Sequence, residues 1–217
     1  MRPARIAIGA AIVAAFVLGT SADAGAQPST VTDRFDAHFR KYSKRFFGPG
    51  FDWRLFKAQG MAESGLNPGA RSWAGARGLM QLMPSTQHEI RSKNPELAVI
   101  PGTIEMNIAA GIAYNRHIWQ LWTADSHHDH LREFMLASYN AGRSTLLRAQ
   151  RVATDALLDA RLWPSIAAVA PRVPRWRYEE TLSYVDRILA NLARMDPAGR
   201  VRVNFHPAAG EPLHGSD

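Results

Sequence analysis

Apolar residues recur every three or four positions along nearly all of residues 31–195, and no run alternates convincingly with a period of two. In the first such run, Phe35, Phe39, Tyr42 and Phe46 share one face. This spacing is typical of amphipathic helices, whereas half-buried strands alternate with a period of two. We therefore expect a predominantly helical domain over residues 31–195.

Glycine, proline and capping residues divide this pattern into segments. The expected helices cover approximately residues 31–47, 52–64, 84–90, 105–122 and 129–139, a shorter stretch after Ser144, an apolar segment 163–171 bounded by proline, and 178–193. We expect Asp52 to cap the second helix and Gly65 to end it. Residues 66–78 contain several glycines and are predicted to form a structured loop.

The first 26 residues have the features of a secretory signal peptide. Arg2 and Arg5 precede an uncharged apolar run from Ile6 to Leu18, and small residues follow. The run is short for a membrane span, and an uncleaved N-terminal anchor is the alternative. We expect residues 1–26 to be removed on export. Residues 196–217 are rich in proline and glycine and are expected to form a flexible C-terminal tail.

The 217-residue chain contains no cysteine, which excludes disulfides, thiolate metal sites, a cysteine nucleophile and a lipid anchor on cysteine. Any chemistry is therefore left to carboxylates, histidines and hydroxyls. The formal net charge of +7 suits an anionic partner, and export favours the cell wall over nucleic acid. Because the charge is mostly arginine spread along the chain, a generally solvated basic surface is the alternative. We expect a soluble exported protein of the periplasm or cell envelope.

Glu63 is the strongest candidate for a catalytic group. It lies near the C-terminal end of the expected helix 52–64, beside Met61 and Leu66. The partial negative charge of a helix C-terminus and an apolar surrounding both disfavour a carboxylate, so we expect the pKa of Glu63 to be raised. A carboxylic acid that stays protonated near neutral pH can act as a general acid on a glycosidic oxygen. The alternative is an exposed glutamate bonded to neighbouring backbone.

An ordered set of sequence blocks carries a family resemblance. The blocks are Glu63-Ser64-Gly65-Leu66-Asn67-Pro68, then Gly75-Ala76-Arg77-Gly78-Leu79-Met80-Gln81, Asn107-Ile108-Ala109-Ala110-Gly111 with Tyr114, Ala137-Ser138-Tyr139-Asn140-Ala141-Gly142, and Glu180-Thr181 with Tyr184-Val185. In this order and spacing they resemble the lytic transglycosylase domain of the soluble lytic transglycosylase (SLT) type, a relative of goose-type lysozyme, over approximately residues 51–189. The resemblance implies a lysozyme-like, mainly α single domain with a long groove for peptidoglycan glycan strands. It also implies Glu63 as the sole catalytic acid/base, and no cofactor.

The resemblance further implies which residues bind the substrate. They are Ser64, Met80, Gln81, Tyr139, Asn140, Glu180 and Tyr184. The methionine and glutamine of the second block would line the groove, and the tyrosine–asparagine pair of the fourth block would orient the substrate. The last two residues are four apart on one expected helix, so both can face the same cleft. The structural alternatives are a tight turn with a core methionine, a helix end closed by Gly142, and a structural hydrogen bond from Glu180.

The sequence departs from the family's usual pattern in three places. Ser138 stands where alanine is usual, Asn115 follows Tyr114 where leucine is usual, and residues 153–175 match none of the blocks. These departures bear on which subfamily the protein resembles and on which end of the glycan strand it prefers. They do not affect the assignment of Glu63 as the catalytic residue.

A histidine-rich stretch, residues 127–130, is the one cluster of metal-ligating residue types. Ligands so close together on one loop make a poor metal site without a distant further ligand. We expect a solvated loop there, with Asp129 capping the next helix, and no metal.

In the reaction that the resemblance implies, Glu63 protonates the oxygen of the β-1,4 bond between N-acetylmuramic acid and N-acetylglucosamine, and the substrate's own 2-acetamido group stabilises the developing charge. Glu63 then takes the proton of the muramoyl C6 hydroxyl, which attacks C1 and leaves a 1,6-anhydromuramoyl end. A hydrolytic muramidase of the goose-lysozyme type is the alternative, with Glu105, Glu179, Glu180 or Asp186 as the second carboxylate that activates water. A non-catalytic wall-binding protein is a third interpretation.

The expected partner is therefore the peptidoglycan glycan strand, bound by a monomer without nucleic acid. Wall recycling, insertion of a secretion apparatus and cell division would all use this chemistry. A secretion or division machine that spans the envelope is accordingly a further candidate partner.

Overall fold

The computed structural model describes residues 33–97, 103–125 and 130–196. The predicted signal peptide and nearly all of the predicted tail lie outside these ranges, as do three residues of the histidine-rich stretch, so those predictions stay untested. Within the described ranges, no helix is both long and apolar enough to cross a membrane.

The described part of the chain is helical, and its only β pairing consists of two isolated antiparallel bridges, Arg71 with Arg77 and Arg77 with Leu82. The α-helices are α1 (Asp36–Phe47), α2 (Arg54–Ser64), α3 (Pro84–Lys93), α4 (Thr103–Asp125), α5 (Leu131–Ala141), α6 (Arg143–Asp155), α7 (Trp163–Val169) and α8 (Tyr178–Met195). Short 3-10 turns cover Asp33–Phe35 (η1), Pro95–Leu97 (η2) and Ala170–Arg172 (η3). The prediction of a mainly helical fold is confirmed.

Most predicted helix ends agree with the structure because they follow from glycine and proline. α1 and α2 end at Gly48 and Gly65, which take φ values of +88° and +63°. α6 is longer than the short helix expected after Ser144: it begins at Arg143 and runs to Asp155. The sequence pattern missed this length because the buried residues of α6 are mainly small ones.

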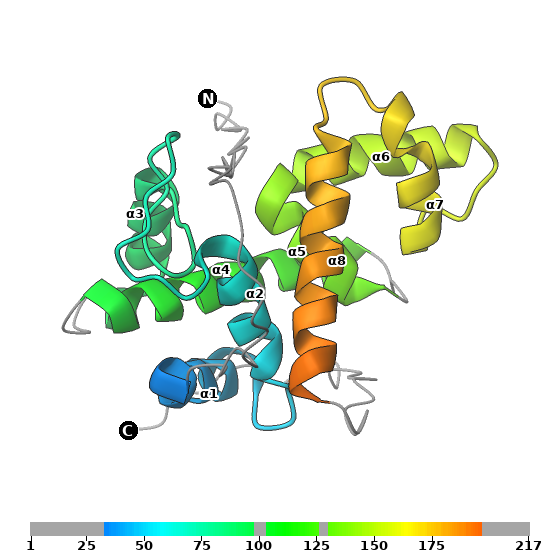
Figure 1. Cartoon of the computed structure of the whole chain (residues 1–217). Coiled ribbons are helices and arrows are strands. Elements are labelled where there is room, and N and C mark those ends of the chain that lie inside the picture. Colours follow the sequence, from blue (N-terminus) through cyan, green and yellow to red (C-terminus); the bar gives the residue numbers. More distant parts are fainter. Residues whose placement is uncertain (1–32, 98–102, 126–129, 197–217) are drawn as a thin grey trace, which may run out of the picture.

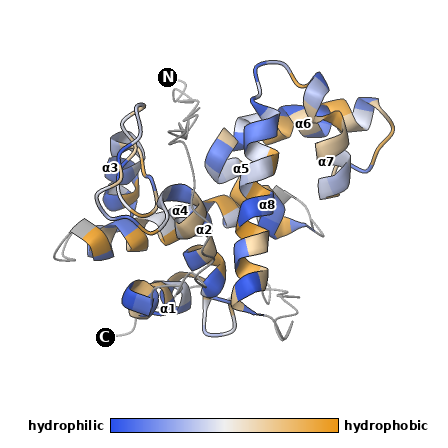
Figure 2. Ribbon diagram, in the orientation of Figure 1, coloured by the Kyte–Doolittle hydropathy of each residue, from blue (hydrophilic) through white to orange (hydrophobic). Residues whose placement is uncertain are grey.

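α2 and α8 pack side by side and antiparallel (Figure 1). Along this pair Arg54 bonds the carbonyl of Met195, and Asn191 Nδ2 donates to the carbonyl of Ala58 at 3.3 Å. Hydrophobic and hydrophilic residues alternate in bands along α8 (Figure 2), as expected for a helix with one buried face. This contact fixes which residues of α8 lie beside the C-terminal end of α2.

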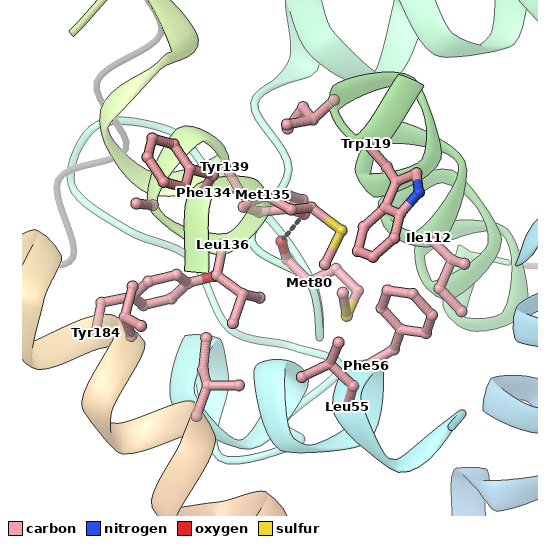
Figure 3. Close-up of a cluster of buried hydrophobic side chains, with 14 of the residues drawn as sticks. Leu55, Phe56, Met80, Ile112, Trp119, Phe134, Met135, Leu136, Tyr139 and Tyr184 are labelled. Carbon is pink, nitrogen blue, oxygen red and sulfur yellow. Dashed lines mark hydrogen bonds between the residues drawn. The ribbon is translucent and has the colours of Figure 1, made fainter. Parts of the chain in front are cut away.

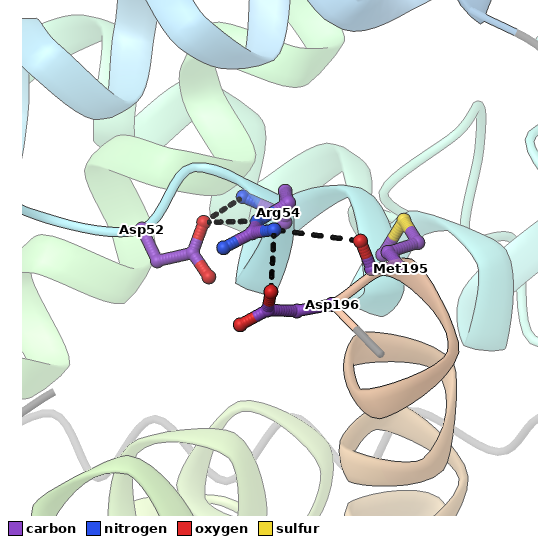
Figure 4. Close-up of polar contacts among 4 residues, drawn as sticks. All are labelled: Asp52, Arg54, Met195 and Asp196. Atoms are coloured by element: carbon purple, nitrogen blue, oxygen red, sulfur yellow. Dashed lines mark hydrogen bonds and ion pairs between the residues drawn. The ribbon is translucent and has the colours of Figure 1, made fainter. Parts of the chain in front are cut away.

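The start of α2 is held by a small ion-pair cluster (Figure 4). Asp52 Oδ1 accepts hydrogen bonds from the backbone N–H of Arg54 at 3.1 Å and from Arg54 Nε at 2.9 Å. Arg54 also reaches Asp196 Oδ1 at 3.4 Å, at the end of α8. The predicted cap at Asp52 is wrong: the N-cap position of α2 is Trp53, which makes no side-chain cap bond. Asp52 lies one residue before it and instead bonds the N–H of Arg54, the first residue of the helix.

The glycine-rich loop between α2 and α3 is a structured element, as predicted. Asn107 of α4 clamps it: Met80 N donates to Asn107 Oδ1 at 2.9 Å, and Asn107 Nδ2 donates to the carbonyl of Arg77 at 3.0 Å. Gly78 makes this close approach possible, because its φ is +77° and a Cβ there would lie 2.6 Å from the Asn107 side chain. The loop is thereby held against α4 and brings Met80 into the core.

The core is built from aromatic and aliphatic side chains of α2, α4, α5 and α8 around Met80 (Figure 3). Gly111 on α4 leaves room for Met80, since a Cβ at Gly111 would lie 2.7 Å from Met80 Cγ. Tyr139 of α5 and Tyr184 of α8 are both almost completely buried in the same cluster. The loop and the helices that carry the predicted site residues therefore share one core.

We expect Gly78→Ala to lower the free energy of unfolding by about 2 kcal/mol or more, because alanine is strained at this φ and its methyl group meets Asn107. Urea unfolding measures this loss. The matched control is Gly69→Ala in the same loop, where the nearest atom to a Cβ is Asn67 Oδ1 at 3.4 Å. Equal losses in the two variants would contradict the proposed clamp.

Candidate active site

Glu63 lies in the last turn of α2 and faces α8. Tyr184 Oη donates a hydrogen bond to Glu63 Oε1 at 2.6 Å. Burial raises the pKa of Tyr184 well above its usual value, so the phenol stays protonated and available as a donor. Of the residues predicted for the site, Glu63 and Tyr184 are thus in direct contact.

The pKa of Glu63 is raised from 4.5 to about 8, mainly because the surrounding side chains remove its carboxyl from water. The hydrogen bond from Tyr184 and the positive charge of Arg187 lower the pKa, whereas the negative charge of Glu180 raises it, and the burial outweighs them. The predicted direction of the pKa shift is confirmed. Near neutral pH, Glu63 is therefore a protonated acid able to donate its proton.

Two fully buried amides continue the hydrogen-bond chain away from Glu63. Gln59 Nε2 donates to Tyr184 Oη at 3.0 Å, and Asn115 Nδ2 donates to Gln59 Oε1 at 2.8 Å. Asn115 Nδ2 also donates to the carbonyl of Gly111 at 3.0 Å. The chain thus links α4, α2 and α8 and ends at the candidate catalytic carboxyl.

Ser64, Met80 and Tyr139 tie the glycine-rich loop to the site. Ser64 Oγ donates to the carbonyl of Leu79 at 2.9 Å and accepts from Asn67 N at 3.2 Å. Tyr139 Oη donates to the carbonyl of Met80 at 2.8 Å (Figure 3), and both of these side chains are buried. All three therefore make structural contacts next to Glu63.

Gln81 adopts a positive φ of +42° and is almost completely buried. Its Nε2 donates to the carbonyls of Gly78 at 2.8 Å and Ala70 at 3.3 Å. Its Oε1 has no hydrogen-bond partner among the described residues. The side chain is thus fixed by its donors, and its acceptor remains available.

Asn140 is oriented by a chain of polar side chains from α8. Trp176 Nε1 donates to Thr181 Oγ1 at 2.9 Å, and Thr181 Oγ1 donates to Asn140 Oδ1 at 2.8 Å. In the described part of the chain no group accepts a hydrogen bond from Asn140 Nδ2. The Asn140 amide is therefore held through its Oδ1, and its Nδ2 group remains available to donate a hydrogen bond.

Among the candidate second carboxylates, Glu180 is the one whose charge acts on Glu63. Glu180 Oε2 pairs with Arg177 Nη1 at 3.1 Å and lies one helical turn before Tyr184 on α8. Glu105 is engaged elsewhere: it accepts hydrogen bonds from Lys41 and Tyr42 of α1, both at 2.9 Å.

Sequence reasoning missed three residues: Arg187, whose charge acts on Glu63, Gln59, which bonds Tyr184, and Asn115, which bonds Gln59. Gln59 and Asn115 are polar residues inside helices, and only the crossing of α2 with α4 brings them together. Their one sequence signal was the asparagine that replaces the usual leucine after Tyr114. Arg187 follows Tyr184 by three positions on α8, a spacing that could have placed it on the same face.

A family model described as the Transglycosylase SLT domain matches residues 41–159. Similar proteins include two called membrane-bound lytic murein transglycosylase F. The one from Desulfosudis oleivorans is 30% identical over 151 residues, covering 64% of this chain and 32% of the relative. The one from Shewanella woodyi is 32% identical over 167 residues, covering 70% and 33%. The chain thus spans about a third of the length of these relatives.

Solved structures with the same fold include an inactive glutamate-to-glutamine mutant of the lytic transglycosylase Slt from Pseudomonas aeruginosa. It gives a TM-score of 0.56 at 23% identity and covers 76% of this chain and 24% of that one. The 70-kDa soluble lytic transglycosylase of Escherichia coli gives 0.53 at 24% identity and covers 77% and 25%. The expected lysozyme-like helical fold is therefore confirmed.

The raised pKa of Glu63 predicts a pH dependence of stability. Between pH 4.5 and about 8 the folded state keeps a proton that the unfolded state releases, so the free energy of unfolding should fall as pH rises through this window. Each unit of pKa shift corresponds to about 1.4 kcal/mol. Glu63→Gln removes this contribution, and we expect the variant to become more stable than the native protein as pH rises.

Urea unfolding from pH 4 to 9 measures this difference. Glu179→Gln is the matched control, since Glu179 is an exposed glutamate on α8 and should keep the pH dependence of the native protein. A difference between Glu63→Gln and the native protein that does not change with pH would contradict a raised pKa.

Proposed function

The chain belongs to the transglycosylase SLT domain family, and from this premise we propose that it is a lytic transglycosylase that cleaves peptidoglycan glycan strands. The bond cleaved is the β-1,4 bond between N-acetylmuramic acid and N-acetylglucosamine, and the product carries a 1,6-anhydromuramoyl end. The relatives named as lytic murein transglycosylases support this reaction.

The observation that carries the proposal is the partly buried carboxyl of Glu63, whose pKa is raised to about 8. A glycosidic oxygen leaves only if an acid protonates it, and an acid with a pKa near the working pH is best suited to do so. The hydrogen bond from Tyr184 to Oε1 leaves Oε2 to carry the proton towards the substrate. The inactive glutamate-to-glutamine mutant of the Pseudomonas aeruginosa protein is in keeping with an essential glutamate in the family.

After the bond breaks, Glu63 is a carboxylate and acts as the base of the second half of the reaction. It takes the proton of the muramoyl C6 hydroxyl, whose oxygen bonds to C1 and closes the anhydro ring. The substrate's 2-acetamido group stabilises the positive charge at C1 in place of a second carboxylate. Intramolecular attack can exceed attack by water, since well-oriented groups reach effective molarities of roughly 10⁵ to 10⁸ M.

The remaining site residues are proposed to hold the sugar beside Glu63. Gln81 offers an unpaired acceptor, and Asn140 offers an unpaired donor on a fixed amide, a combination that suits the N–H and C=O of an N-acetyl group. Ser64, Met80 and Tyr139 support the loop that carries Gln81, and Glu180 faces the site from α8.

The second candidate function is a hydrolytic muramidase. It is favoured by Glu180, whose charge acts on Glu63 and which could activate a water molecule. The two reactions differ in their products, because hydrolysis leaves reducing muramic acid ends.

We also propose that residues 1–26 direct export and that the mature protein acts as a soluble monomer in the periplasm or cell envelope, working on the wall alone or with a secretion or division machine. The apolar run after Arg2 and Arg5 supports export.

We expect Glu63→Gln to lower the release of soluble muropeptides from purified peptidoglycan by at least about 10³-fold, since the proton donor is lost. The control Glu179→Gln should retain native activity. Retention of most activity by Glu63→Gln, with its fold intact by circular dichroism, would sink the proposed role of Glu63.

Mass spectrometry of the native enzyme's products separates the two candidate reactions. We expect 1,6-anhydromuramoyl ends to dominate. Reducing muramic acid ends would instead establish the hydrolase.

A further inference from the structure

The hydrogen-bond chain behind Glu63 consists of two side-chain amides and one phenol, and all three side chains are buried. Gln59 lies on α2, about one turn before Glu63, whereas Asn115 lies on α4 and Tyr184 on α8. Buried polar groups destabilise a protein unless they are paired, and paired groups polarise one another. The direction of every bond in this chain therefore matters.

The direction of the chain is fixed at its far end by the backbone carbonyl of Gly111, which can only accept a hydrogen bond. The Asn115 side-chain atom that lies 3.0 Å from this carbonyl must therefore be the donor Nδ2. The same Nδ2 lies 2.8 Å from Gln59, so the Gln59 atom that faces it must be the acceptor Oε1. Gln59 accordingly turns its other polar atom, the donor Nε2, to Tyr184 Oη at 3.0 Å.

The phenol of Tyr184 therefore accepts a hydrogen bond from α2 and has one proton of its own to donate. Tyr184 makes no hydrogen bond with a described residue other than those with Gln59 and Glu63. A buried hydroxyl proton without an acceptor is unfavourable, so this proton points at Oε1 of Glu63, 2.6 Å away. When Glu63 is protonated, its own proton must then lie on Oε2.

Asn115 also shows that this arrangement is not the most stable one for the fold. Its Oδ1 is buried and has no hydrogen-bond partner among the described residues. A buried acceptor without a partner destabilises a protein, and an apolar side chain of the same shape would not do so. Such an exception needs an explanation, and the orientation that Asn115 imposes on Gln59 supplies one.

We propose that Gln59 and Asn115 are positioning residues that fix the direction of the Tyr184 hydroxyl. Through this hydroxyl they make Oε1 of Glu63 an acceptor and leave Oε2 as the oxygen that donates to the substrate. The inference rests on the proposed function, because only a general acid needs its proton on a particular oxygen. It adds to that function two fully buried residues that act without touching the substrate.

The chain also acts on the ionisation of Glu63, because the hydrogen bond from Tyr184 favours its carboxylate and lowers its pKa. Two further groups of α8 act on Glu63: the positive charge of Arg187 lowers the pKa, and the negative charge of Glu180 raises it. Hydrogen bonds in a buried chain strengthen one another. Loss of the bond from Gln59 should therefore weaken the bond from Tyr184 and raise the pKa of Glu63 further.

The other helices around this site also carry titratable groups. Burial raises the pKa of Tyr139 on α5 well above its usual value and also raises that of Tyr114 on α4, so both remain neutral phenols below pH 10. On α1, Asp36 is ion-paired with Lys57 of α2. Glu63 is therefore the group whose titration should follow a change in the two amides.

The test compares Asn115→Leu, Gln59→Met and the double variant, which replace the amides by apolar groups of similar size. Titration of Glu63, followed through the pH dependence of urea unfolding, is the main readout and needs no substrate. In Asn115→Leu the Gln59 amide can turn over and accept the phenol proton, and in Gln59→Met the donor is lost. We expect the Glu63 midpoint to rise by roughly half a pH unit in all three variants.

Stability separates a positioning role from a structural one. Each single variant leaves a buried amide without its partner, so the urea midpoint should fall, and the double variant should recover most of it. The raised Glu63 midpoint should nevertheless remain in the double variant. Recovery of the urea midpoint together with a Glu63 titration identical to that of the native protein would overturn the inference.

Asn191→Leu is the matched control. Asn191 is a buried asparagine of α8 that donates to the carbonyl of Ala58 on α2 and accepts from Arg194, and neither bond leads to Tyr184. This variant should lose stability and keep the native Glu63 midpoint. A shift as large as that in Asn115→Leu would show that any amide lost from this helix contact moves the titration, and the inference would be wrong.

Cleavage of soluble glycan strands tests the consequence for the proposed reaction. With the proton no longer confined to Oε2, we expect the double variant to lower kcat about tenfold and to leave KM unchanged, since the amides do not contact the substrate. The alkaline limb of the pH profile of kcat should move up with the Glu63 midpoint. An unchanged kcat and pH profile would contradict the placement of the proton on Oε2. If the native protein cleaves no strands, the proposed function is refuted, while the titration of the variants still decides the role of the two amides.

Discussion

The antiparallel contact between α2 and α8 places the candidate catalytic carboxyl, that of Glu63. It is held at one end by Arg54, which bonds Asp52 and Asp196, and at the other by the hydrogen bond from Tyr184 to Glu63. Because both ends belong to the same pair of helices, the position of the Glu63 carboxyl does not depend on a loop. Hydrogen bonds from Met80 to Asn107 and from Tyr139 to Met80 hold the glycine-rich loop against these helices.

The pKa of Glu63 is set by opposing interactions. Burial favours the protonated form of Glu63, whereas Tyr184 and Arg187 favour the carboxylate, and the balance leaves the pKa at about 8. An acid with strong partners would stay ionised, and one without any could not release its proton to the substrate in the first half of the reaction. The proposed chemistry needs both forms of the same residue, and this opposition makes both accessible near neutral pH.

Most helix boundaries and the raised pKa of Glu63 could be predicted from the sequence, for identifiable physical reasons. Glycine and proline mark the ends of helices through their local backbone geometry. Gly48 and Gly65 therefore predicted the C-terminal ends of α1 and α2, and Pro84 predicted the start of α3. The raised pKa of Glu63 followed from its apolar neighbours. The amide pair Gln59 and Asn115 did not, because their contact depends on how two helices cross, which no local pattern records.

The central claim is that Glu63 holds a proton at neutral pH because its carboxyl is partly buried beside Tyr184 and removed from water. Titration of the Glu63 side-chain carboxyl by ¹³C NMR, assigned by comparison with the Glu63→Gln variant, measures this directly in the native protein. The account predicts a midpoint near pH 8. A midpoint near 4.5, the ordinary value for a glutamate, would contradict it.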